Sequence, residues 1–200
     1  MRAMSIAPIV QAGTPVLRQR AAELDPARIR TSEIQSLIET MIATMRAAPG
    51  VGLAAPQVGV GLRIFVLEDR AELLANLSAT EIAERGRVAF GARVFINPTL
   101  TLIGDERVGF FEGCLSVNGY AGWVERAAAV EVTGLDEHGA LQMWRVSGWP
   151  ARILQHEFDH LEGALYVDRM RTRSFATAEL AKARYGGKSA AEIRALMEIG

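Results

Sequence analysis

The sequence predicts an α+β domain in which mainly antiparallel β-sheets pack around a central helix. Three observations predict this fold class. An apolar stripe with helical periodicity lies near the start of the chain, several short apolar runs follow it, and a second helical pattern comes after them. Half of the 200 residues are apolar, so one domain can bury a substantial core without disulfides.

The first helix is predicted from apolar residues that recur at the spacing of one helix face. They are Ile34, Leu37, Ile38, Met41, Ile42 and Met45. Ser32 with Gln35 is typical of a capping box, and Pro49 with Gly50 ends the helix. Core packing explains this helix, and we assign it no chemistry.

Five short runs indicate β-strands, because apolar residues lie between turn signals. They are residues 63–68, 93–96, 99–103, 127–134 and 140–146. We expect Asn97-Pro98 to form a turn between two of these strands and residues 136–139 to form a hairpin turn. The mixed, charged residues 70–91 are predicted to be a surface insertion with a helix start at Ser78.

The second helix is predicted from Pro150 to Glu162. Proline suits the first turn, since the amide that it lacks would be unpaired there, and Gly163 suits the position after the end. Residues 174–184 and 189–198 indicate one or two terminal helices.

Composition and charge argue against several classes of protein. The formal net charge is −1 and no block of like charge stands out, so a nucleic-acid site is not indicated. No stretch approaches the ~18 apolar residues of a membrane span. The single cysteine cannot form an internal disulfide, which favours a reducing compartment, and the cytoplasm is the expected location.

The sharpest chemical signal is His-Glu-Phe-Asp-His at residues 156–160, inside the second predicted helix. Residues four apart lie on one helix face, so His156 and His160 can bind the same ion. Glu157 lies beside them, where a carboxylate can handle the proton of a water molecule. Incidental histidines on a charged surface are the alternative, but two of the chain's three histidines fall in this pattern.

A catalytic metal site of this kind usually has three protein ligands and one open position. No histidine follows His160, and Glu179 and Glu192 are only nominal candidates for the third ligand. Cys114 in Glu-Gly-Cys-Leu-Ser is a better candidate, because Gly113 allows another chain or a ligand to approach the backbone closely. A small buried apolar residue is the other explanation of a lone cysteine.

The third signal is Gly-Val-Gly-Leu-Ala-Ala-Pro-Gln at residues 50–57. Its small residues suit close contact with an extended ligand, although a tightly packed turn explains the same pattern. It is not a phosphate-binding loop, because the Lys-Ser/Thr ending is absent. Gln57 offers an amide donor at the end of the segment.

In this order, the three segments resemble the signature motifs of peptide deformylases: Gly-x-Gly-x-Ala-Ala-x-Gln, Glu-Gly-Cys-x-Ser and Gln-His-Glu-x-Asp-His. All motif positions match, and the resemblance covers roughly residues 14–170. Residues 117–120 lack the proline of many bacterial members. The insertion and residues 147–152 are more similar to the organelle-type 1A subgroup of the type 1 enzymes.

The resemblance implies one divalent metal ion, with ferrous iron expected and zinc, nickel or cobalt able to substitute. The implied ligands are Cys114, His156 and His160. Glu157 is then the catalytic acid and base, while the Leu115 backbone N–H and the Gln57 amide stabilise the oxyanion.

The implied reaction removes the formyl group from the N-terminal formyl-methionine of nascent polypeptides. We expect the backbone of Val51, Gly52 and Gly113 to pair with this substrate as an added strand. The side chains expected to border the methionine pocket are Phe110, Trp149 and Ile153, although core packing explains each equally well. Transient ribosome contact is compatible with this substrate, and neither a nucleic-acid site nor a membrane partner is expected.

The resemblance also implies a catalytic domain over residues 1–170 and a C-terminal helical extension of the same domain over residues 171–200. The sequence leaves two other hypotheses about function open. A zinc peptidase of another family would share His-Glu-x-x-His, but Glu-Gly-Cys-Leu-Ser argues against it. A catalytically silent deformylase-like binding protein is disfavoured by the complete motifs.

Overall fold

Helices and an antiparallel sheet make up the structure, a computed structural model that describes residues 5–75 and 77–198. The strands are β1 (Gly52–Ala54), β2 (Ile64–Asp69), β3 (Phe90–Cys114), β4 (Val117–Leu135), β5 (Leu141–Ser147) and β6 (Ala176–Thr177). The helices are α1 (Ser32–Ala47), α2 (Ala71–Leu74), α3 (Ala79–Arg85), α4 (Gly148–Leu161), α5 (Ala178–Tyr185) and α6 (Ala190–Glu198). The predicted α+β class is confirmed.

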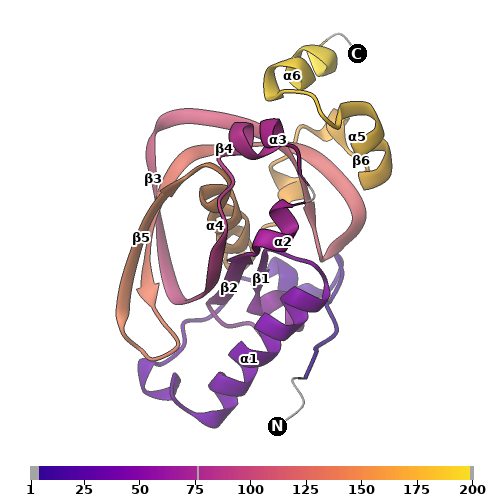
Figure 1. The fold of residues 1–200 in the computed structure, drawn as a ribbon. Helices are drawn as coiled ribbons and strands as arrows, with labels where there is room; N and C mark the ends of the chain where they lie inside the picture. The colour runs from indigo at the N-terminus through magenta and orange to yellow at the C-terminus, as the bar shows by residue number, and fades with distance from the viewer. Residues whose placement is uncertain (1–4, 76, 199–200) are drawn as a thin grey trace.

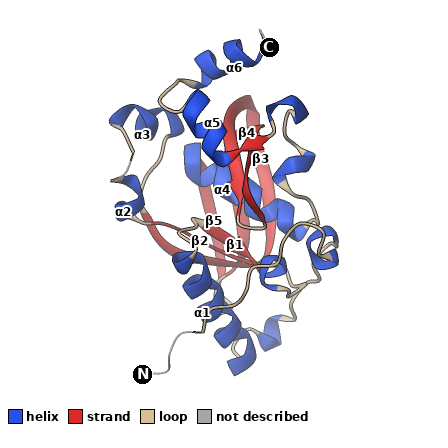
Figure 2. Cartoon of the chain, turned by 90° about the vertical axis from the view of Figure 1, so that its right-hand side faces the viewer, coloured by secondary structure: helices blue, strands red, loops and turns tan. Residues whose placement is uncertain are grey.

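The sheet is wrapped around α4. Its strands pair antiparallel in the order β1-β2-β3-β4-β5, and β6 adds to β4. Figure 1 shows α4 inside the curve of β3, β4 and β5, with α1 below the sheet and α5 and α6 at the opposite end. Figure 2 shows the same central place of α4 from the side. The helix that carries His156–His160 is therefore enclosed on several sides.

The first predicted helix is confirmed as α1, but its cap differs from the prediction. Thr31, not Ser32, is the N-cap, and its side chain accepts a hydrogen bond from the Ile34 N–H. Gln35 instead donates to the carbonyls of Ile29 and Glu137, 2.8 Å from each. The predicted capping box was wrong. Thr31 caps the helix in place of Ser32, and Gln35 is hydrogen-bonded to backbone carbonyls outside the helix.

Strand β3 is much longer than the two short strands that the sequence indicated. Asn97-Pro98 is a local irregularity within β3, not a turn: Asn97 has φ +50°, and the register with β4 shifts between Ile96 and Thr99. The Asn97 side chain pairs with both backbone groups of Leu24, at 2.8 and 2.7 Å, which accounts for the bulge. The pairing then continues to Cys114 opposite Val117.

The β3–β4 hairpin places Cys114 beside a two-residue turn, Leu115-Ser116. The sequence missed this hairpin because glycines and charged residues dilute the apolar alternation there. The hairpin between β4 and β5 is confirmed. Helix α4 begins at Gly148, two residues before the prediction.

The C-terminal residues form two helices, as one of the two predicted arrangements had it, and β6 precedes them on the edge of β4. The division at residue 170 stays a prediction. Ser78 is confirmed as a helix start, since it forms a capping box with Glu81 on α3.

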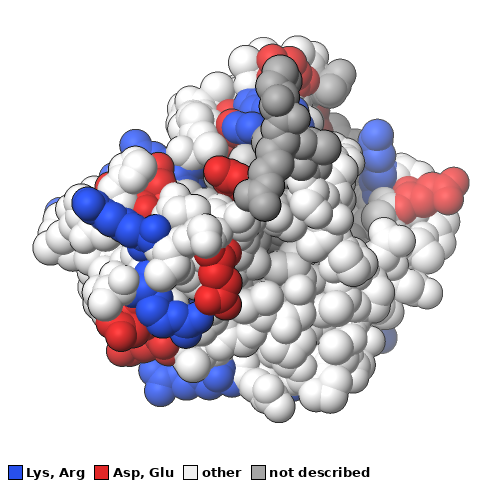
Figure 3. All heavy atoms as spheres, turned by 90° about the horizontal axis from the view of Figure 1, so that it is seen from below, with Lys and Arg blue, Asp and Glu red and all other residues white. Residues whose placement is uncertain are grey.

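Charge is mixed on the face in Figure 3, where blue and red residues intermingle at one edge and uncharged residues cover most of the rest. Among the helices of the described residues, none has the length and apolar character needed to cross a membrane.

Candidate metal centre

Helix α4 is held in place by a side chain from the third motif. Gln155 accepts a hydrogen bond from the Ala127 N–H and donates to the Ala127 carbonyl, both at 3.0 Å. These bonds attach α4 to the backbone of β4. His156, Glu157 and His160 therefore occupy fixed positions relative to the end of β3, where Cys114 lies.

The three expected ligands lie together. The candidate ligand atoms of Cys114, His156 and His160 are all within 4.8 Å of one another. The Cys114 Sγ is 3.3 Å from the His160 Nε2, and the two imidazole rings have centroids 5.1 Å apart. One thiolate and two imidazoles in this arrangement suit a divalent transition metal.

The charges around the ligands also suit a cation. Burial lowers the pKa of His160 well below its usual value, which keeps the ring in the neutral form that binds metal. Burial opposes a charge on His156 as well, but hydrogen bonds to Cys114 and Glu112 raise its pKa well above the usual value. Positive charge is thus favoured between Cys114 and Glu112, and the residues present fit a metal ion.

Glu112 orients one of the candidate ligands. Its carboxylate lies 3.1 Å from the His156 Nδ1, which leaves the Nε2 for the metal. Burial alone would raise the pKa of Glu112, but Arg126 and His156 together hold it well below its usual range. Glu112 therefore stays ionised although it is buried.

A buried ion-pair network supports Glu112. Arg126 reaches both Glu112 oxygens, at 2.6 and 2.8 Å, and also Asp159 at 2.8 Å. Arg152 donates to Glu112 as well, and Arg169 forms a bidentate pair with Asp159 at 2.6 Å. The network joins β3, β4 and α4, so it fixes the two parts of the site that carry the ligands.

Gln57 lies against the Cys114 sulfur. Its Oε1 accepts from the Ala54 N–H at 2.9 Å, while its Nε2 is 3.5 Å from the Cys114 Sγ and 3.2 Å from the Ser116 Oγ. The residue is 2% exposed. Nearby, the Leu115 N–H donates to no acceptor among the described residues, so it is free to bind a ligand oxygen.

Glu157 is a buried acid with one carboxylate oxygen, Oε2, that has no hydrogen-bond partner among the described residues. Burial raises the pKa of Glu157 to about 7, while His156 and Arg126 oppose the rise. A carboxyl with a pKa near neutrality can both accept and donate a proton.

A cavity of about 460 Å³ opens beside these groups. It brings together most of the residues expected to contact substrate: Val51, Gly52, Gly113, Leu115, Trp149 and Ile153. Phe110 is the exception. It lies edge-on behind Trp149, with ring centroids 6.2 Å apart, and faces a neighbouring cavity.

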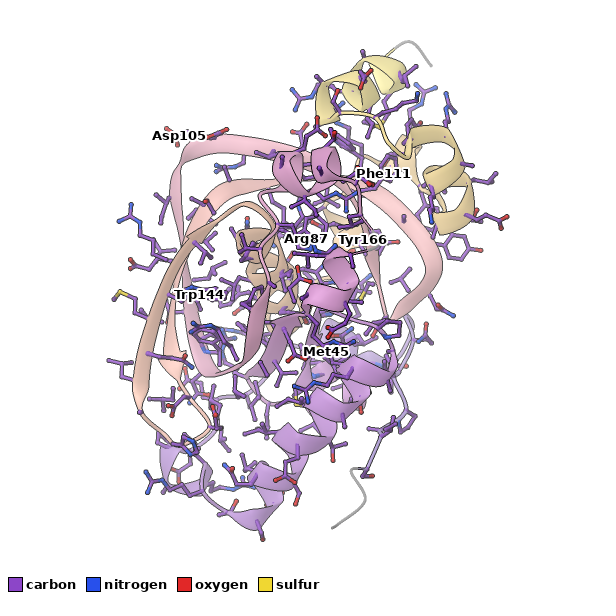
Figure 4. All side chains as sticks on the ribbon, viewed as in Figure 1. Met45, Arg87, Asp105, Phe111, Trp144 and Tyr166 are labelled. Atoms are coloured by element: carbon purple, nitrogen blue, oxygen red, sulfur yellow. The ribbon has the colours of Figure 1, made fainter. Side chains whose placement is uncertain are left out.

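Several supporting residues were missed by the sequence analysis. Glu112 and Asp159 lie within the three motifs, so their motif positions could have indicated a role in the site. Arg126 lies outside every motif. Tyr166 was also missed, and its ring stacks on His156 with centroids 6.4 Å apart. Figure 4 shows Tyr166 in the interior of the molecule.

Comparisons with known proteins agree on one family. The family model described as polypeptide deformylase matches residues 6–176. Peptide deformylase 1A, chloroplastic, of Solanum lycopersicum is 50% identical over 171 residues, which cover 86% of this chain and 62% of that protein. The mitochondrial peptide deformylase of Homo sapiens is 41% identical over 167 residues, covering 84% of this chain and 69% of that protein.

A solved structure agrees as well. The class I type b peptide deformylase from Acinetobacter baumannii with Met-Ala-Ser bound has a TM-score of 0.74 and 33% identity, and the match covers 84% of this chain and 99% of that chain. This chain spans only 62% and 64% of the lengths of the two plant relatives that it matches.

Proposed function

The chain belongs to the polypeptide deformylase family, and from this membership we propose that it hydrolyses the N-formyl group of peptides that begin with formyl-methionine. One observation carries the proposal: Cys114, His156 and His160 offer three ligand atoms within 4.8 Å of one another. The same cavity holds Gln57 and Glu157, which have the chemistry that amide hydrolysis needs.

The reaction breaks the bond between the formyl carbon and the amide nitrogen, and it yields formate and a free amine. A divalent metal bound by the three ligands supplies Lewis acidity and lowers the pKa of water. Glu157 accepts the proton of the attacking water. It then donates that proton to the departing amine, and a pKa of about 7 suits both steps.

The oxyanion needs hydrogen-bond donors, and two are near the ligand sulfur. The Leu115 N–H is unoccupied by protein acceptors in the described part of the chain, and the Gln57 amide is held beside Cys114. We assign both to the oxyanion that develops on the formyl oxygen. One such donor is typically worth about 3–4 kcal/mol of barrier.

Ferrous iron is the proposed ion, and zinc, nickel or cobalt are the alternatives, because thiolate and imidazole ligands accept several divalent metals. Purification without oxygen, followed by metal analysis and assay, tests this choice. We expect the iron-loaded enzyme to lose activity in air while a nickel-loaded sample keeps it. Undiminished activity of the iron form in air would count against an oxidation-prone iron centre.

Nascent formylated chains are the proposed partners, and transient ribosome contact follows from where such chains emerge. We also propose a cytoplasmic location, which Cys114 supports because a cysteine without a disulfide is typical of a reducing compartment. The plant relatives are named chloroplastic, so fractionation of cells that make the full-length protein is the test.

The deciding experiment for the function uses formyl-Met-Ala-Ser and its unformylated counterpart. We expect formate release from the first peptide and no cleavage of the second. Glu157→Gln should retain metal and fold but lose nearly all turnover. Cleavage inside the unformylated peptide would favour a zinc peptidase, and metal binding without formate release would favour a silent binding protein.

A further inference from the structure

Two cavities lie side by side and share part of one wall. The first, of about 460 Å³, is lined by two of the candidate metal ligands, Cys114 and His156. The second, of about 590 Å³, lies between α3 and the C-terminal helices. Three residues line both cavities: Arg85, Phe111 and Ala178. Of these, Arg85 has the longest side chain, and it comes from the segment that the sequence marked only as a surface insertion.

The Arg85 guanidinium lies over two aromatic rings. Its Cζ is 5.0 Å from the ring centroid of Trp149 and 5.8 Å from that of Phe110. Trp149 lines the first cavity and Phe110 the second, and the two rings meet edge-on. The arginine therefore lies across the boundary between the two cavities.

Arg85 has no hydrogen bond or ion pair with any of the described residues, in contrast to the arginines around it. Arg87 is paired with Asp69, at 2.7 Å, and Arg152 with Glu112. Burial lowers the pKa of Arg85, and the acids that oppose this, led by Glu81, lie on its own helix. Its position thus depends on ring contacts and packing, so truncation would leave no buried carboxylate unpaired.

The backbone fixes where Arg85 stands. Gly148 has φ +67°, and a Cβ on it would lie 2.8 Å from the Gly86 carbonyl oxygen and 2.9 Å from that of Arg85. The end of α3 therefore packs directly on the start of α4, one residue before Trp149. This close approach needs glycine at position 148 and holds Arg85 at the same place relative to α4.

We propose that Arg85 determines specificity by forming the end wall of the pocket for the first side chain of the substrate. The proposal rests on the proposed function and deepens it. Trp149 precedes His156 by seven residues, which places it about 10 Å away along the axis of α4. A methionine side chain fits within that length, whereas a longer chain meets the arginine.

Removal of the Arg85 side chain beyond Cβ would join the two cavities. The second cavity offers apolar surface from Leu77, Phe110 and Ile193. Long, unbranched apolar first side chains should then become substrates.

The test compares formyl-Met-Ala-Ser with the same peptide carrying 2-aminodecanoic acid in place of methionine. The readout is the ratio of kcat/KM for the long substrate to that for the methionine substrate. We expect Arg85→Ala to raise this ratio at least tenfold, mainly through KM. Arg85→Lys should raise it much less, because the lysine stem still blocks the boundary.

Arg93→Ala is the matched control. The Arg93 guanidinium also lies over a tryptophan, 4.4 Å from the Trp144 ring centroid, but Arg93 lines neither cavity. Figure 4 shows Trp144 beside β5, far across the molecule from Phe111. An unchanged ratio in folded Arg85→Ala, or an equal rise in Arg93→Ala, would overturn the proposal.

A binding measurement separates this proposal from the proposed function. Calorimetry with Met-Ala-Ser and 2-aminodecanoyl-Ala-Ser gives an affinity ratio that needs no turnover. If the wild-type protein releases no formate, the proposed function is rejected. The affinity ratio still tests whether Arg85 closes the pocket for the first side chain. We expect Arg85→Ala to shift that ratio toward the long peptide at least tenfold, and no shift would reject the role of Arg85.

Discussion

Gly52 and Glu157 are in such close contact that a Cβ on Gly52 would lie 2.2 Å from the Glu157 Oε1. Real Cβ atoms essentially never approach an oxygen that closely, so any side chain at position 52 must displace the carboxylate. Glycine at position 52 of the first motif is therefore needed to leave room for the Glu157 carboxylate of the third motif. The acid of α4 and the backbone of β1 form one surface, although over a hundred residues of sequence separate them.

Gly52→Ala should lower kcat about 100-fold while the metal content stays near normal, because a misplaced acid/base loses its alignment with the reacting bond. Single-turnover assays and metal analysis check this. The control is Gly61→Ala, where the nearest atom to a new Cβ is 3.8 Å away on Val16. Equal activity of the two variants would contradict the steric argument.

Cys114→Ser should lose most of its metal, since a hydroxyl is a much poorer ligand than a thiolate. Elemental analysis of the purified variant checks this, and we expect less than a tenth of the wild-type content. Ser116→Ala is a suitable control, because Ser116 lies in the same turn but is not a ligand. An intact metal content in the cysteine variant would remove Cys114 from the site.

Gln57→Ala should lower kcat about 100- to 1000-fold with little change in KM, as for the loss of one oxyanion donor. Steady-state kinetics at saturating metal give both constants. Because Gln57 also contacts the Cys114 Sγ, metal content must be measured on the same sample. A change confined to KM would show that Gln57 binds substrate instead.

Glu112→Gln should weaken metal binding about 10- to 100-fold, because the carboxylate that orients His156 is lost. Competition with a chelator measures the affinity, and circular dichroism checks the fold. Arg169→Met is the control, since it breaks an ion pair of the same network without touching His156. If both variants bind metal as the wild type does, the network has only a structural role.

The Arg46–Glu68 pair predicts a pH-dependent stability. The hydrogen bonds from Arg46 lower the pKa of Glu68 from its ordinary value of 4.5. A lowered carboxyl pKa stabilises the folded state above the ordinary value, and this stabilisation is lost as the pH falls through the folded pKa. Arg46 is partly exposed, so solvent screens the pair, and Arg46→Met should cost about 1 kcal/mol at pH 7.

The same cost should shrink as the pH falls from 4.5 through the lowered pKa of Glu68 in the folded wild type, because the carboxyl then becomes protonated in the folded protein as well. Urea unfolding of the two proteins at pH 7 and at about pH 3, more than one unit below the ordinary carboxyl pKa, gives the difference. Arg28→Met, which breaks the exposed pair with Glu33, should change little at either pH. A cost that is independent of pH would reject the role of Glu68.

Much of the candidate site follows from the sequence alone. The spacing of His156 and His160 on a helix puts both imidazoles on one face whatever the rest of the chain does, because helix geometry is local. The motif resemblance then identified Cys114 and Gln57 as their partners. The structure brings all four side chains together, as expected.

Other features were decided by the tertiary structure, because they depend on contacts between distant segments. Arg126 supports the site because β4 places it between Glu112 and Asp159, where it donates to both. No local sequence pattern marks such a residue. Arg85 belongs to a segment without any motif. It lines the cavity because Gly148 allows the end of α3 to pack closely on the start of α4. Local rules determined which side chains can bind the metal, and long-range packing decided which groups orient them and bound the cavity beside them.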